Sequence, residues 1–562
     1  MKLRDLLHEI NHRFVRGDEN APISGIAIDS RLVKRGDLFV AIAGREADGH
    51  EFIPQAVENG AAAILVANGW AFGGDAPGDL SSGDASYDRG FGGASGASAS
   101  FSVVSVPDTR VILSKIVNRF HGEPSRKFTL VGVTGTNGKT SVATLINHIW
   151  VKAGRRTGLL GTIENYCLGE VMEVRRTTPT NPDCVELGDI MSRMADRGVD
   201  YLVMEATSMG LKMGRVGSCD FDVAVFTNLS PEHLDDHGGM EDYKASKIKL
   251  FELAKSAVVN ADDPASGEFI AHAKGSVIRY GVNGGASGCD LYAEGLEYSP
   301  DGVSFDLVSR ETEIEGMPDV PDAGFSESGK PARRGDIPAG ERARVNLSTP
   351  APFAVYNALA AAAACVATGV SFKDVAAALN EPVEIPGRYE VVTSEDGVAV
   401  VVDYAHTEKA LENLLEAVRS NPSYGRLISV FGCGGDRDPG KRAPMGEISG
   451  RLADYTIITS DNPRTEDPAA IIARIEEGIK PTGGAYETEP DRAKAVERAI
   501  LSAKSGDVVV VAGKGHEDYQ IIGREKVHLD DRETAEAALK RRNADENRKV
   551  AARFPHEFSE QA

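Results

Sequence analysis

The sequence has few cysteines, and they form no pattern. Its 562 residues contain six of them, none in a C-x-x-C pair: Cys167, Cys184, Cys219, Cys289, Cys365 and Cys433. This scatter argues against a zinc site and against a disulfide framework, and it is typical of proteins in a reducing compartment. We therefore expect the protein in the cytoplasm.

Long apolar runs and an excess of positive charge are also missing. The N-terminal residues, Met-Lys-Leu-Arg-Asp-Leu-Leu-His, lack the apolar core of a signal peptide. No run approaches the ~20 apolar residues of a membrane-spanning helix. The formal net charge is −22. We expect neither a membrane nor a nucleic acid as a partner, and we expect a monomer whose Lys and Arg side chains are concentrated where it binds anions.

The chain is too long for one hydrophobic core, because domains usually contain about 100–200 residues. Short β-branched runs alternate with helical segments along it. The clearest runs are residues 62–66, 201–204, 223–226, 398–402, 427–430 and 508–511. Such alternation is typical of α/β folds with mostly parallel sheets.

Two stretches have too few large apolar residues to offset the entropy of ordering them. Residues 73–100 are almost wholly Gly, Ala, Ser and Asp, and residues 316–342 are rich in Pro, Gly, Glu and Arg. Both compositions predict mobile surface insertions without a catalytic role. We expect domains at 1–125, 126–350 and 351–545, followed by a tail at 546–562.

The most informative motif is a glycine-rich turn. Residues 131–141 read Val-Gly-Val-Thr-Gly-Thr-Asn-Gly-Lys-Thr-Ser and follow an apolar run. Gly132, Gly135 and Gly138 would let the backbone approach an anion, and the next helix would offer unpaired N–H groups. Lys139 would reach the outer phosphates of ATP, and Thr140 would ligate Mg²⁺.

Further candidate ligands follow predicted strands, where functional groups of parallel sheets usually lie. Glu205 ends the strand at 201–204, and a carboxylate there suits a nucleotide-bound Mg²⁺, although a solvated strand-end glutamate is the alternative. The next strand runs into residues 227–237, Thr-Asn-Leu-Ser-Pro-Glu-His-Leu-Asp-Asp-His, which are dense in possible ligands and bases.

Together these motifs resemble those of the Mur ligases, ATP-dependent amide-bond-forming enzymes of peptidoglycan synthesis. The resemblance extends to Met-Glu-Ala-Thr-Ser at 204–208, Tyr-Lys-Ala-Ser-Lys at 243–247, Asn-Ala-Asp-Asp at 260–263, Asp-Ser-Arg at 29–31, Pro-Gly-Arg at 386–388, Val-Asp-Tyr-Ala-His-Thr at 402–407 and Gly-Lys-Gly-His-Glu at 513–517. It implies three α/β domains: an N-terminal uridine-nucleotide-binding domain, a central P-loop ATPase-like domain with a mostly parallel sheet, and a C-terminal Rossmann-like domain.

Asp461-Asn462-Pro463-Arg464 resembles the signature of the family members that add meso-2,6-diaminopimelate to UDP-N-acetylmuramoyl-L-alanyl-D-glutamate (UDP-MurNAc-L-Ala-D-Glu). Diaminopimelate carries a distal carboxylate that lysine lacks, and Arg464 offers a planar fork that can bind a carboxylate through two hydrogen bonds. A ligase that uses L-lysine remains an alternative. So do a related folate ligase, which the Asp-Ser-Arg domain disfavours, and a catalytically weak nucleotide-binding scaffold.

The resemblance also implies a set of residues for each ligand. The catalytic residues are Lys139, Glu205, His233 and Lys247. ATP is assigned Gly135, Thr136, Asn137, Gly138, Lys139, Thr140, Ser141, Asn260, Asp263, Arg388, Asp403 and His406. The UDP-MurNAc-dipeptide is assigned Ile28, Ser30, Arg45, Glu46, Ala47, Thr177, Thr178, Thr207 and Arg215. Diaminopimelate is assigned Arg437, Asp461, Asn462, Pro463, Arg464, Gly513 and Glu517.

Two Mg²⁺ ions are implied, with ligands from Thr140, Glu205, His233 and Lys247. Lys247 corresponds to the family's carbamylated lysine, formed from CO₂, whereas residue chemistry alone favours a solvated helix lysine. In the implied reaction a substrate carboxylate takes the γ-phosphate of ATP, and an amine then displaces phosphate from the acyl phosphate. Both steps gather negative charge, which Lys139 and the metal ions would neutralise.

One departure from the family pattern affects residues 205–211. The usual Glu-Val-Ser-Ser-His-Ala-Leu reads Glu-Ala-Thr-Ser-Met-Gly-Leu in this chain, so Met209 stands where a histidine is expected. A methionine neither ionises nor hydrogen-bonds as an imidazole does. Thr207 keeps the hydroxyl of the usual serine. We expect slow turnover if that histidine contributes to substrate or metal geometry.

Overall fold

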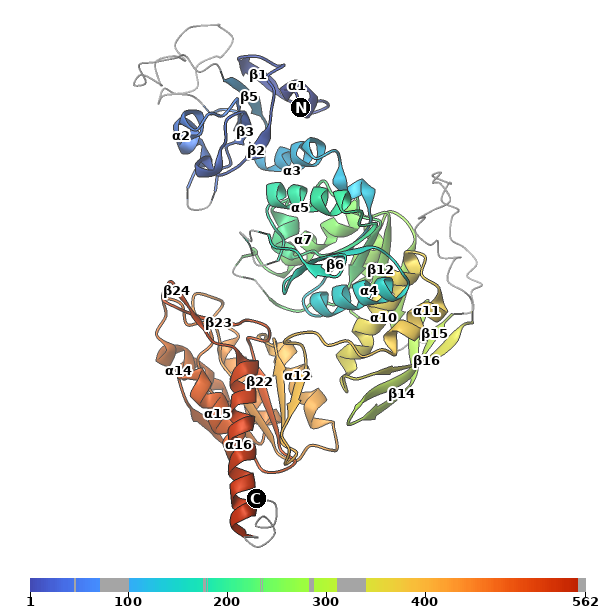
Figure 1. Ribbon diagram of the computed structural model, residues 1–562, viewed down its shortest axis with the longest axis vertical. Coiled ribbons are helices and arrows are strands. Elements are labelled where there is room, and N and C mark those ends of the chain that lie inside the picture. Colours follow the sequence, from blue (N-terminus) through green and yellow to red (C-terminus); the bar gives the residue numbers. More distant parts are fainter. Residues whose placement is uncertain are drawn as a thin grey trace, which may run out of the picture. The chain divides into compact units, whose positions relative to one another are not determined.

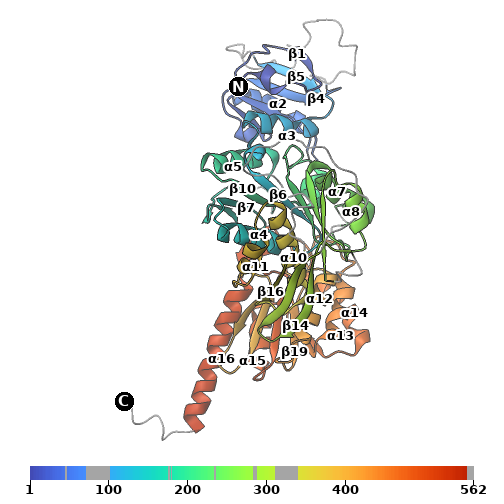
Figure 2. The same cartoon turned by 90° about the vertical axis from the view of Figure 1, so that its right-hand side faces the viewer.

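The computed structural model describes residues 1–44, 47–70, 101–174, 178, 180–232, 234, 236–282, 288–310 and 340–553, with side chains up to residue 544. The expected insertion at 73–100 lies outside the described residues, as does most of the one at 316–342, although Arg342 already begins a strand. The chain divides into two compact units, residues 1–130 with 156–222 and residues 131–155 with 223–562. Each is described by itself, with the labels of Figures 1 and 2.

The first unit begins with a five-stranded sheet in the order β1-β5-β4-β3-β2. Its strands are β1 (Arg13–Arg16), β2 (Gly25–Ala27), β3 (Asp37–Val40), β4 (Ala63–Ala67) and β5 (Ser102–Val106), of which only β1 pairs antiparallel. Alternate residues of β3, β4 and β5 enter two cores, since side chains alternate along a strand. Around the sheet lie α1 (Leu3–Leu6), α2 (Ile53–Glu58), α3 (Thr109–Phe120) and the 3₁₀ helices at Ser30–Leu32 and Gly49–Phe52.

The rest of the first unit supplies a second set of strands in the order β10-β7-β8-β9. These are β7 (Thr157–Leu160), β8 (Asn165–Cys167), β9 (Glu170–Val171) and β10 (Tyr201–Glu205), with β10 and β7 parallel. The helices are α5 (Cys184–Asp196) and α6 (Ser208–Lys212), and a 3₁₀ helix spans Pro124–Lys127. α5 packs on α3 of the same unit.

The second unit contains strands in the order β16-β15-β14-β13-β12-β11-β6. They are β6 (Thr129–Thr134), β11 (Val223–Phe226), β12 (Ser256–Asn260), β13 (Val277–Gly281), β14 (Leu291–Ser299), β15 (Gly302–Ser309) and β16 (Arg342–Leu347). From β6 to β14 the pairing is parallel, and β15 and β16 continue it antiparallel. The helices are α4 (Lys139–Lys152), α7 (Met240–Leu253), α8 (Ser266–Ala271), α10 (Pro352–Ala367) and α11 (Phe372–Leu379).

The alanine-rich helix α10 is buried over most of its length and packs on α4, and α11 packs on α4 and β16 (Figure 1). The Trp150 indole of α4 donates a hydrogen bond of 3.0 Å to Thr368 Oγ1, just after α10. Both helices thus pack on α4, the helix that follows the phosphate loop, before the chain enters the C-terminal sheet.

The C-terminal part of the second unit is a six-stranded sheet in the order β17-β18-β22-β19-β20-β21. Its strands are β17 (Glu390–Thr393), β18 (Ala399–Asp403), β19 (Leu427–Phe431), β20 (Tyr455–Ile458), β21 (Tyr486–Thr488) and β22 (Val508–Ala512), all parallel except β17. The antiparallel hairpin of β23 (Tyr519–Ile522) and β24 (Glu525–His528) follows.

Helices cover both faces of this sheet. On one face, α12 (Glu408–Arg419), α13 (Arg442–Leu452) and α14 (Pro468–Ile479) share a core with the strands. On the other, α15 (Arg492–Ser502) and α16 (Asp531–Arg553) do the same, and the two helices lie side by side in Figure 2. A 3₁₀ helix at Lys480–Thr482 extends α14. The arrangement is that of a doubly wound α/β domain.

The predicted α/β class with mostly parallel sheets is confirmed, and each of the six apolar runs forms a strand. One prediction about the glycine-rich turn is wrong. Gly132 lies inside β6, in register with Ala224 of β11, so the loop itself begins after Thr134. None of the described helices combines the length and the apolar character needed to cross a membrane.

The long helix α16 is fixed to the sheet by Arg542. Its Nε donates 2.9 Å to Asp396 Oδ2 in the turn between β17 and β18, and its Nη1 donates 3.1 Å to the carbonyl of Ile500 at the end of α15. The hydrogen bonds from Arg542 lower the pKa of Asp396 to about 2. A carboxyl whose pKa is lowered by folding stabilises the fold above its unfolded pKa of about 4 and loses this effect as the pH falls toward its folded value.

We therefore expect Asp396→Asn to lower the unfolding free energy at pH 7 by about 1.5–3 kcal/mol, the usual contribution of a hydrogen bond to a charged group. The difference from wild type should shrink at pH 3. Urea unfolding followed by circular dichroism, with hydrogen exchange of α16 as a local readout, would measure both effects. The exposed Glu525→Gln is the control, and an equal loss in that variant would contradict the assignment.

Candidate functional site

The glycine-rich turn forms a loop between β6 and the N-terminus of α4. Gly135 has a φ of +148°, and a Cβ built on it would lie 1.9 Å from Thr227 Oγ1, so a side chain cannot fit there. Gly138, with a φ of +86°, is the N-cap of α4. Unpaired N–H groups at the start of a helix favour anions. The loop thus has the backbone form expected of a phosphate site.

The loop is held in shape by the segment that follows β11. Asn228 accepts from the Asn137 N–H through its side-chain Oδ1 at 2.9 Å, and its backbone carbonyl accepts from the Thr136 N–H at 2.8 Å. Thr227 Oγ1 donates to the Asn137 carbonyl at 2.6 Å, and Thr136 Oγ1 donates to the Ser230 carbonyl at 3.1 Å. The phosphate loop therefore depends on the loop after the neighbouring strand.

Two lysines meet at one carbonyl of this loop. Lys139 Nζ donates to the carbonyls of Gly135 at 3.0 Å and Thr136 at 2.7 Å, and Lys247 Nζ from α7 donates to the same Gly135 carbonyl at 2.7 Å. Lys247 is 1% exposed and lies over the Tyr243 ring, 4.4 Å from its centroid. Burial, with a further contribution from the nearby charge of Lys139, lowers the pKa of Lys247 well below its ordinary value. The neutral amine therefore forms more readily at Lys247 than at an ordinary lysine.

Asn260 and Asp263 both support the loop after β11. Asn260 Nδ2 donates 2.8 Å to the Thr227 carbonyl, and Asp263 Oδ2 accepts from the Leu229 N–H at 3.0 Å. Burial raises the pKa of Asp263, although hydrogen bonds from the Ala265 and Leu229 amides oppose the shift. Their assignment to the adenine side of ATP stays a prediction.

Three of the predicted ATP residues come from the C-terminal sheet. Arg388 Nη2 donates 3.4 Å to Thr140 Oγ1 of the P-loop helix, and its guanidinium lies 4.3 Å from the centre of the Tyr404 ring. His406 Nε2 is 3.1 Å from Glu232 Oε1 in the segment after β11. Asp403, the last residue of β18, accepts from the backbone amides of Tyr389 and Ala405 at 2.7 and 2.8 Å.

Asp403 is partly buried, and desolvation raises its pKa, with the Arg388 charge and the two amides acting in the opposite direction. Its oxygens are used to fix the chain around Arg388. Arg388 and His406 are therefore the two side chains of this group that reach the phosphate loop and the segment after β11.

In the first unit, Glu205 is the last residue of β10 and is 1% exposed. Its Oε1 accepts from the Thr162 N–H at 2.7 Å, and its Oε2 accepts from Thr162 Oγ1 at 3.0 Å. Thr162 follows β7, the parallel neighbour of β10. Sequence reasoning missed Thr162, although its place after a strand end was a usable signal.

Asn181 is a second residue that the sequence analysis missed. Its Nδ2 donates 2.6 Å to the Glu205 carbonyl, and its Oδ1 accepts from the Thr207 N–H at 2.8 Å and from Thr207 Oγ1 at 2.7 Å. Thr178 Oγ1 and Arg215 Nη1 donate to its carbonyl. Asn181 thus brings together three of the residues assigned to the UDP-MurNAc-dipeptide.

Arg215 is partly buried, and burial lowers its pKa. Met209 lies half-buried in α6, whose N-cap is Thr207. In the N-terminal sheet region, Ser30 Oγ donates 2.7 Å to Gln55 Oε1, and the carbonyl of Ala47 accepts from Gly44 at 2.9 Å. Ile28 follows β2. The predicted residues Arg45, Glu46, Thr177 and His233 lie outside the described residues.

The predicted diaminopimelate residues lie in loops after β19, β20 and β22. Asn462 Nδ2 donates 3.0 Å to Glu517 Oε2, and Arg464 Nη1 donates 2.7 Å to the Gly435 carbonyl. Arg464 has a φ of +51°, and its N–H donates 3.0 Å to the Ile521 carbonyl of β23. The structure brings three loops and the β23 hairpin together around Arg464.

The remaining members of this set are less closely held. Arg437 is exposed and its Nη1 donates 3.1 Å to the carbonyl of Asp436. Pro463 presents its carbonyl to Gly435, where a Cβ would lie 1.9 Å from it. Gly513 directly follows β22, and a Cβ there would lie 2.8 Å from Asp461 Oδ2. A Cβ would be too close to a neighbouring oxygen at both Gly435 and Gly513, which explains the glycine at each position.

Within the described ranges, no three His, Cys, Asp or Glu side chains group closely enough to hold a metal ion. Mg²⁺ is usually held by one or two carboxylates together with substrate phosphates and water. The Thr140 hydroxyl and the Glu205 carboxylate are hard oxygen donors of the kind that Mg²⁺ prefers. All six cysteines are buried and none of them forms a disulfide.

The chain is similar to known protein families in three successive regions. Three family profiles match in order: the Mur ligase family catalytic domain at residues 22–77, the Mur ligase middle domain at 133–365 and the Mur ligase glutamate ligase domain at 387–515. Lys139 and Lys247 fall in the middle profile. The residues assigned to diaminopimelate fall in the last profile, except Glu517, which lies two residues beyond its end.

Relatives match over nearly the whole chain. The UDP-N-acetylmuramoyl-L-alanyl-D-glutamate–2,6-diaminopimelate ligase of Alkaliphilus metalliredigens is 40% identical over 551 residues, covering 97% of this chain and 99% of the relative. Ligase 2 of the same name from Clostridium acetobutylicum is 38% identical, covering 96% and 100%. A solved structure of such a ligase is 28% identical, with a TM-score of 0.61 and coverage of 96% and 99%. The chain therefore belongs to the Mur ligase family.

Proposed function

We propose that this protein adds meso-2,6-diaminopimelate to UDP-MurNAc-L-Ala-D-Glu, consuming ATP and giving the tripeptide, ADP and phosphate. The observation that carries this proposal is the setting of Arg464. Its Nη1 is fixed by the Gly435 carbonyl, whereas its Nε and Nη2 have no hydrogen-bond partner among the described residues. That open edge of the guanidinium suits a carboxylate bound through two parallel hydrogen bonds. The names of the relatives support the same substrate.

The reaction needs two steps. The D-glutamyl carboxylate attacks the γ-phosphorus of ATP, the bond to the bridging oxygen breaks, and an acyl phosphate and ADP form. The amine of diaminopimelate then attacks the acyl carbon, and phosphate leaves from the tetrahedral intermediate. Lys139, at the phosphate loop, would stabilise the charge that develops on the transferred phosphoryl group.

We propose two Mg²⁺ ions, which when bound would neutralise phosphate charge and orient the phosphoryl group; the Thr140 hydroxyl and the Glu205 carboxylate are oxygen donors of the kind that Mg²⁺ prefers. Thr140, Glu205 and His233 would hold them, together with a carbamate on Lys247. Thr162 contributes by fixing both carboxylate oxygens of Glu205 through hydrogen bonds of 2.7 and 3.0 Å. A preset carboxylate loses less conformational entropy when it binds a metal ion.

Lys247 also fits carbamylation. Only a neutral amine takes up CO₂, and burial of Lys247 beside Lys139 lowers its pKa well below the ordinary lysine value. The Tyr243 ring covers the amine, and α7 is anchored near the phosphate loop through the Gly135 carbonyl. An anionic carbamate here would face the charge of Lys139 and be stabilised by it.

Water must be kept from the acyl phosphate. Arg388 and His406, both from the C-terminal sheet, reach Thr140 and Glu232 in the P-loop region. We infer that these contacts help to close the C-terminal sheet over the nucleotide and complete the site only when both parts are together.

The direct test uses purified protein, ATP, Mg²⁺ and UDP-MurNAc-L-Ala-D-Glu with meso-diaminopimelate or L-lysine. We expect phosphate release and a product of the mass of the diaminopimelate tripeptide, with much less product from lysine. Product mainly with lysine would overturn the substrate assignment. No product with either amino acid would favour a catalytically weak nucleotide-binding scaffold. This is the alternative suggested by Met209, which stands where the family pattern has a histidine.

Arg464→Ala should reduce kcat/KM for diaminopimelate by about 10- to 100-fold, because a charge-assisted hydrogen bond contributes about 1.5–3 kcal/mol. Activity with lysine, if measurable, should change little, since lysine lacks the distal carboxylate. Steady-state kinetics with both amino acids would measure this. Arg474→Ala, which removes an exposed arginine of α14, is the matched control and should behave as wild type. Equal losses with both amino acids would contradict the assigned role.

Lys247→Ala should nearly abolish product formation, and a short carboxylate such as formate should partly restore it by supplying the missing anion. The wild-type protein in ¹³C-bicarbonate should show a carbamate carbonyl signal by NMR that Lys247→Ala lacks. Lys249→Ala, on the same helix, is the control and should retain both activity and signal. A wild-type spectrum without the signal would rule out carbamylation under those conditions.

A further inference from the structure

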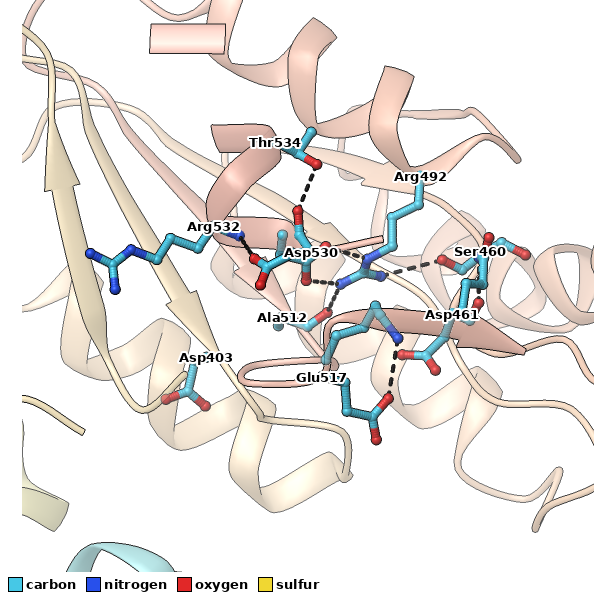
Figure 3. A network of polar contacts seen from close by, with 12 residues as sticks. Asp403, Ser460, Asp461, Arg492, Ala512, Glu517, Asp530, Arg532 and Thr534 are labelled. Atoms are coloured by element: carbon cyan, nitrogen blue, oxygen red, sulfur yellow. Dashed lines mark hydrogen bonds and ion pairs between the residues drawn. The ribbon is translucent and has the colours of Figure 1, made fainter. Parts of the chain in front are cut away.

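Five charged side chains lie together near the residues assigned to diaminopimelate; Figure 3 labels Asp461, Arg492 and Glu517 among them. We call them the charged network: Asp461, Arg492, Lys514, Glu517 and Asp531. They come from the loops after β20 and β22 and from the first residues of α15 and α16. Arg492, Lys514 and Asp531 are at most 1% exposed. Asp461 and Glu517 belong to the set assigned to diaminopimelate, whereas the other three were not predicted as site residues.

Arg492 anchors the network to the ends of the strands. Its Nε and Nη2 donate to the two carboxylate oxygens of Asp531 at 2.8 and 2.7 Å. Nη2 also donates 2.9 Å to the carbonyl of Ala512, the last residue of β22, and Nη1 donates 3.3 Å to the Ser460 carbonyl after β20. One guanidinium therefore fixes the starting points of the two loops that carry Asp461 and Glu517.

Lys514 occupies the other side of the network. Its Nζ donates 3.1 Å to Glu517 Oε2 and 3.4 Å to Asn462 Oδ1. Asn462 in turn donates 3.0 Å to the same Glu517 Oε2 and accepts 2.9 Å from the Ile521 N–H of β23. Lys514, Asn462 and Glu517 thus form a closed triangle of hydrogen bonds around one carboxylate oxygen.

The second oxygen of Glu517 is left open. Both donors reach Oε2, and Oε1 has no hydrogen-bond partner in the described part of the chain. Figure 3 shows this oxygen pointing away from the network. The Glu517 side chain is 17% exposed, in contrast to 0% for Lys514. A ligand can therefore approach Oε1 but not Lys514.

The network contains three carboxylates and two cations, and the charge of Lys441 also acts on Asp461. Burial alone would raise the pKa of Asp461, but the charges of Arg492, Lys514 and Lys441 bring it below the ordinary value. Glu517 Oε1 is an acceptor that an ammonium group can reach and pair with. A free amino acid carries such a group.

We propose that Lys514 is a positioning residue for the incoming amino acid, holding Glu517 Oε2 so that Oε1 is directed at the amino acid's ammonium group. This inference rests on the proposed ligase function. Stability is a weak explanation for the buried lysine, because an apolar side chain of similar volume often replaces a buried ion pair at no cost. If Lys514 positions the partly exposed carboxylate of Glu517, its charge has a role that an apolar side chain could not fill.

The test compares Lys514→Met, Glu517→Gln and the double variant in the full-length protein. Lys514→Met keeps the length of the side chain and removes its donors and charge. We expect its KM for diaminopimelate to rise about 10- to 100-fold, with the KM for ATP changed less than about twofold. In the Glu517→Gln background, Lys514→Met should add less than about twofold, because residues that act through one contact are not additive.

Arg542→Met is the matched control, since it removes another buried cation paired with a carboxylate in the same sheet domain. It should lower the thermal midpoint but leave the KM for diaminopimelate unchanged. Equal rises in the KM values for diaminopimelate and ATP after Lys514→Met, or additive effects in the double variant, would overturn this inference alone. Failure of the wild-type protein to form product with any amino acid would overturn the proposed function, and this inference with it.

Discussion

Parallel strand pairing is the constraint on which the candidate sites depend. Parallel neighbours end at the same edge of a sheet, so the loops that follow them must meet there. β6 and β11 bring the phosphate loop against the Thr227–Ser230 segment, and β19, β20 and β22 bring the pocket loops around Arg464. In the first unit, β7 and β10 place Thr162 against Glu205 in the same way. Each contact joins residues that are distant in sequence because their strands are neighbours.

Buried basic side chains are the second common feature of these edges. Lys247 donates to the Gly135 carbonyl and lies over the Tyr243 ring. Arg492 donates to the Asp531 carboxylate and to two carbonyls, and Lys514 donates to Glu517 and Asn462. Removing a cation from water is costly unless partners replace its hydration. Each of these three side chains has at least one partner at the end of a strand or in the loop that follows it. The protein is strongly acidic overall, yet these three basic side chains lie beside loops to which ligands are assigned.

The sequence predicted the elements of the fold well, because hydrophobic periodicity and glycine-rich turns are local signals. It also predicted Lys139, Glu205 and Arg464 at strand ends or loops, where they lie, although their roles stay predictions. It misplaced Gly132, because a glycine in a Gly-rich run can equally belong to the strand, and backbone pairing with β11 decides the matter. Tertiary packing, which local residue order does not show, also puts α10 and α11 against α4.

The supporting residues escaped sequence reasoning for a related reason. Thr162 and Asn181 hydrogen-bond to partners 43 and 24 or 26 residues away, and nothing in their own neighbourhoods names those partners. Lys514 lies only 3 residues from Glu517, but local residue order does not show that both it and Asn462 donate to the same carboxylate oxygen. The sequence by itself determined the alternation of strands and helices, the phosphate loop and the motifs of the Mur ligase family, since these follow from local residue order. Only the tertiary structure decided which oxygen of Glu517 stays open, which carbonyl two lysines share and which side chains fix Glu205, because these depend on distances between loops that the chain brings together after folding.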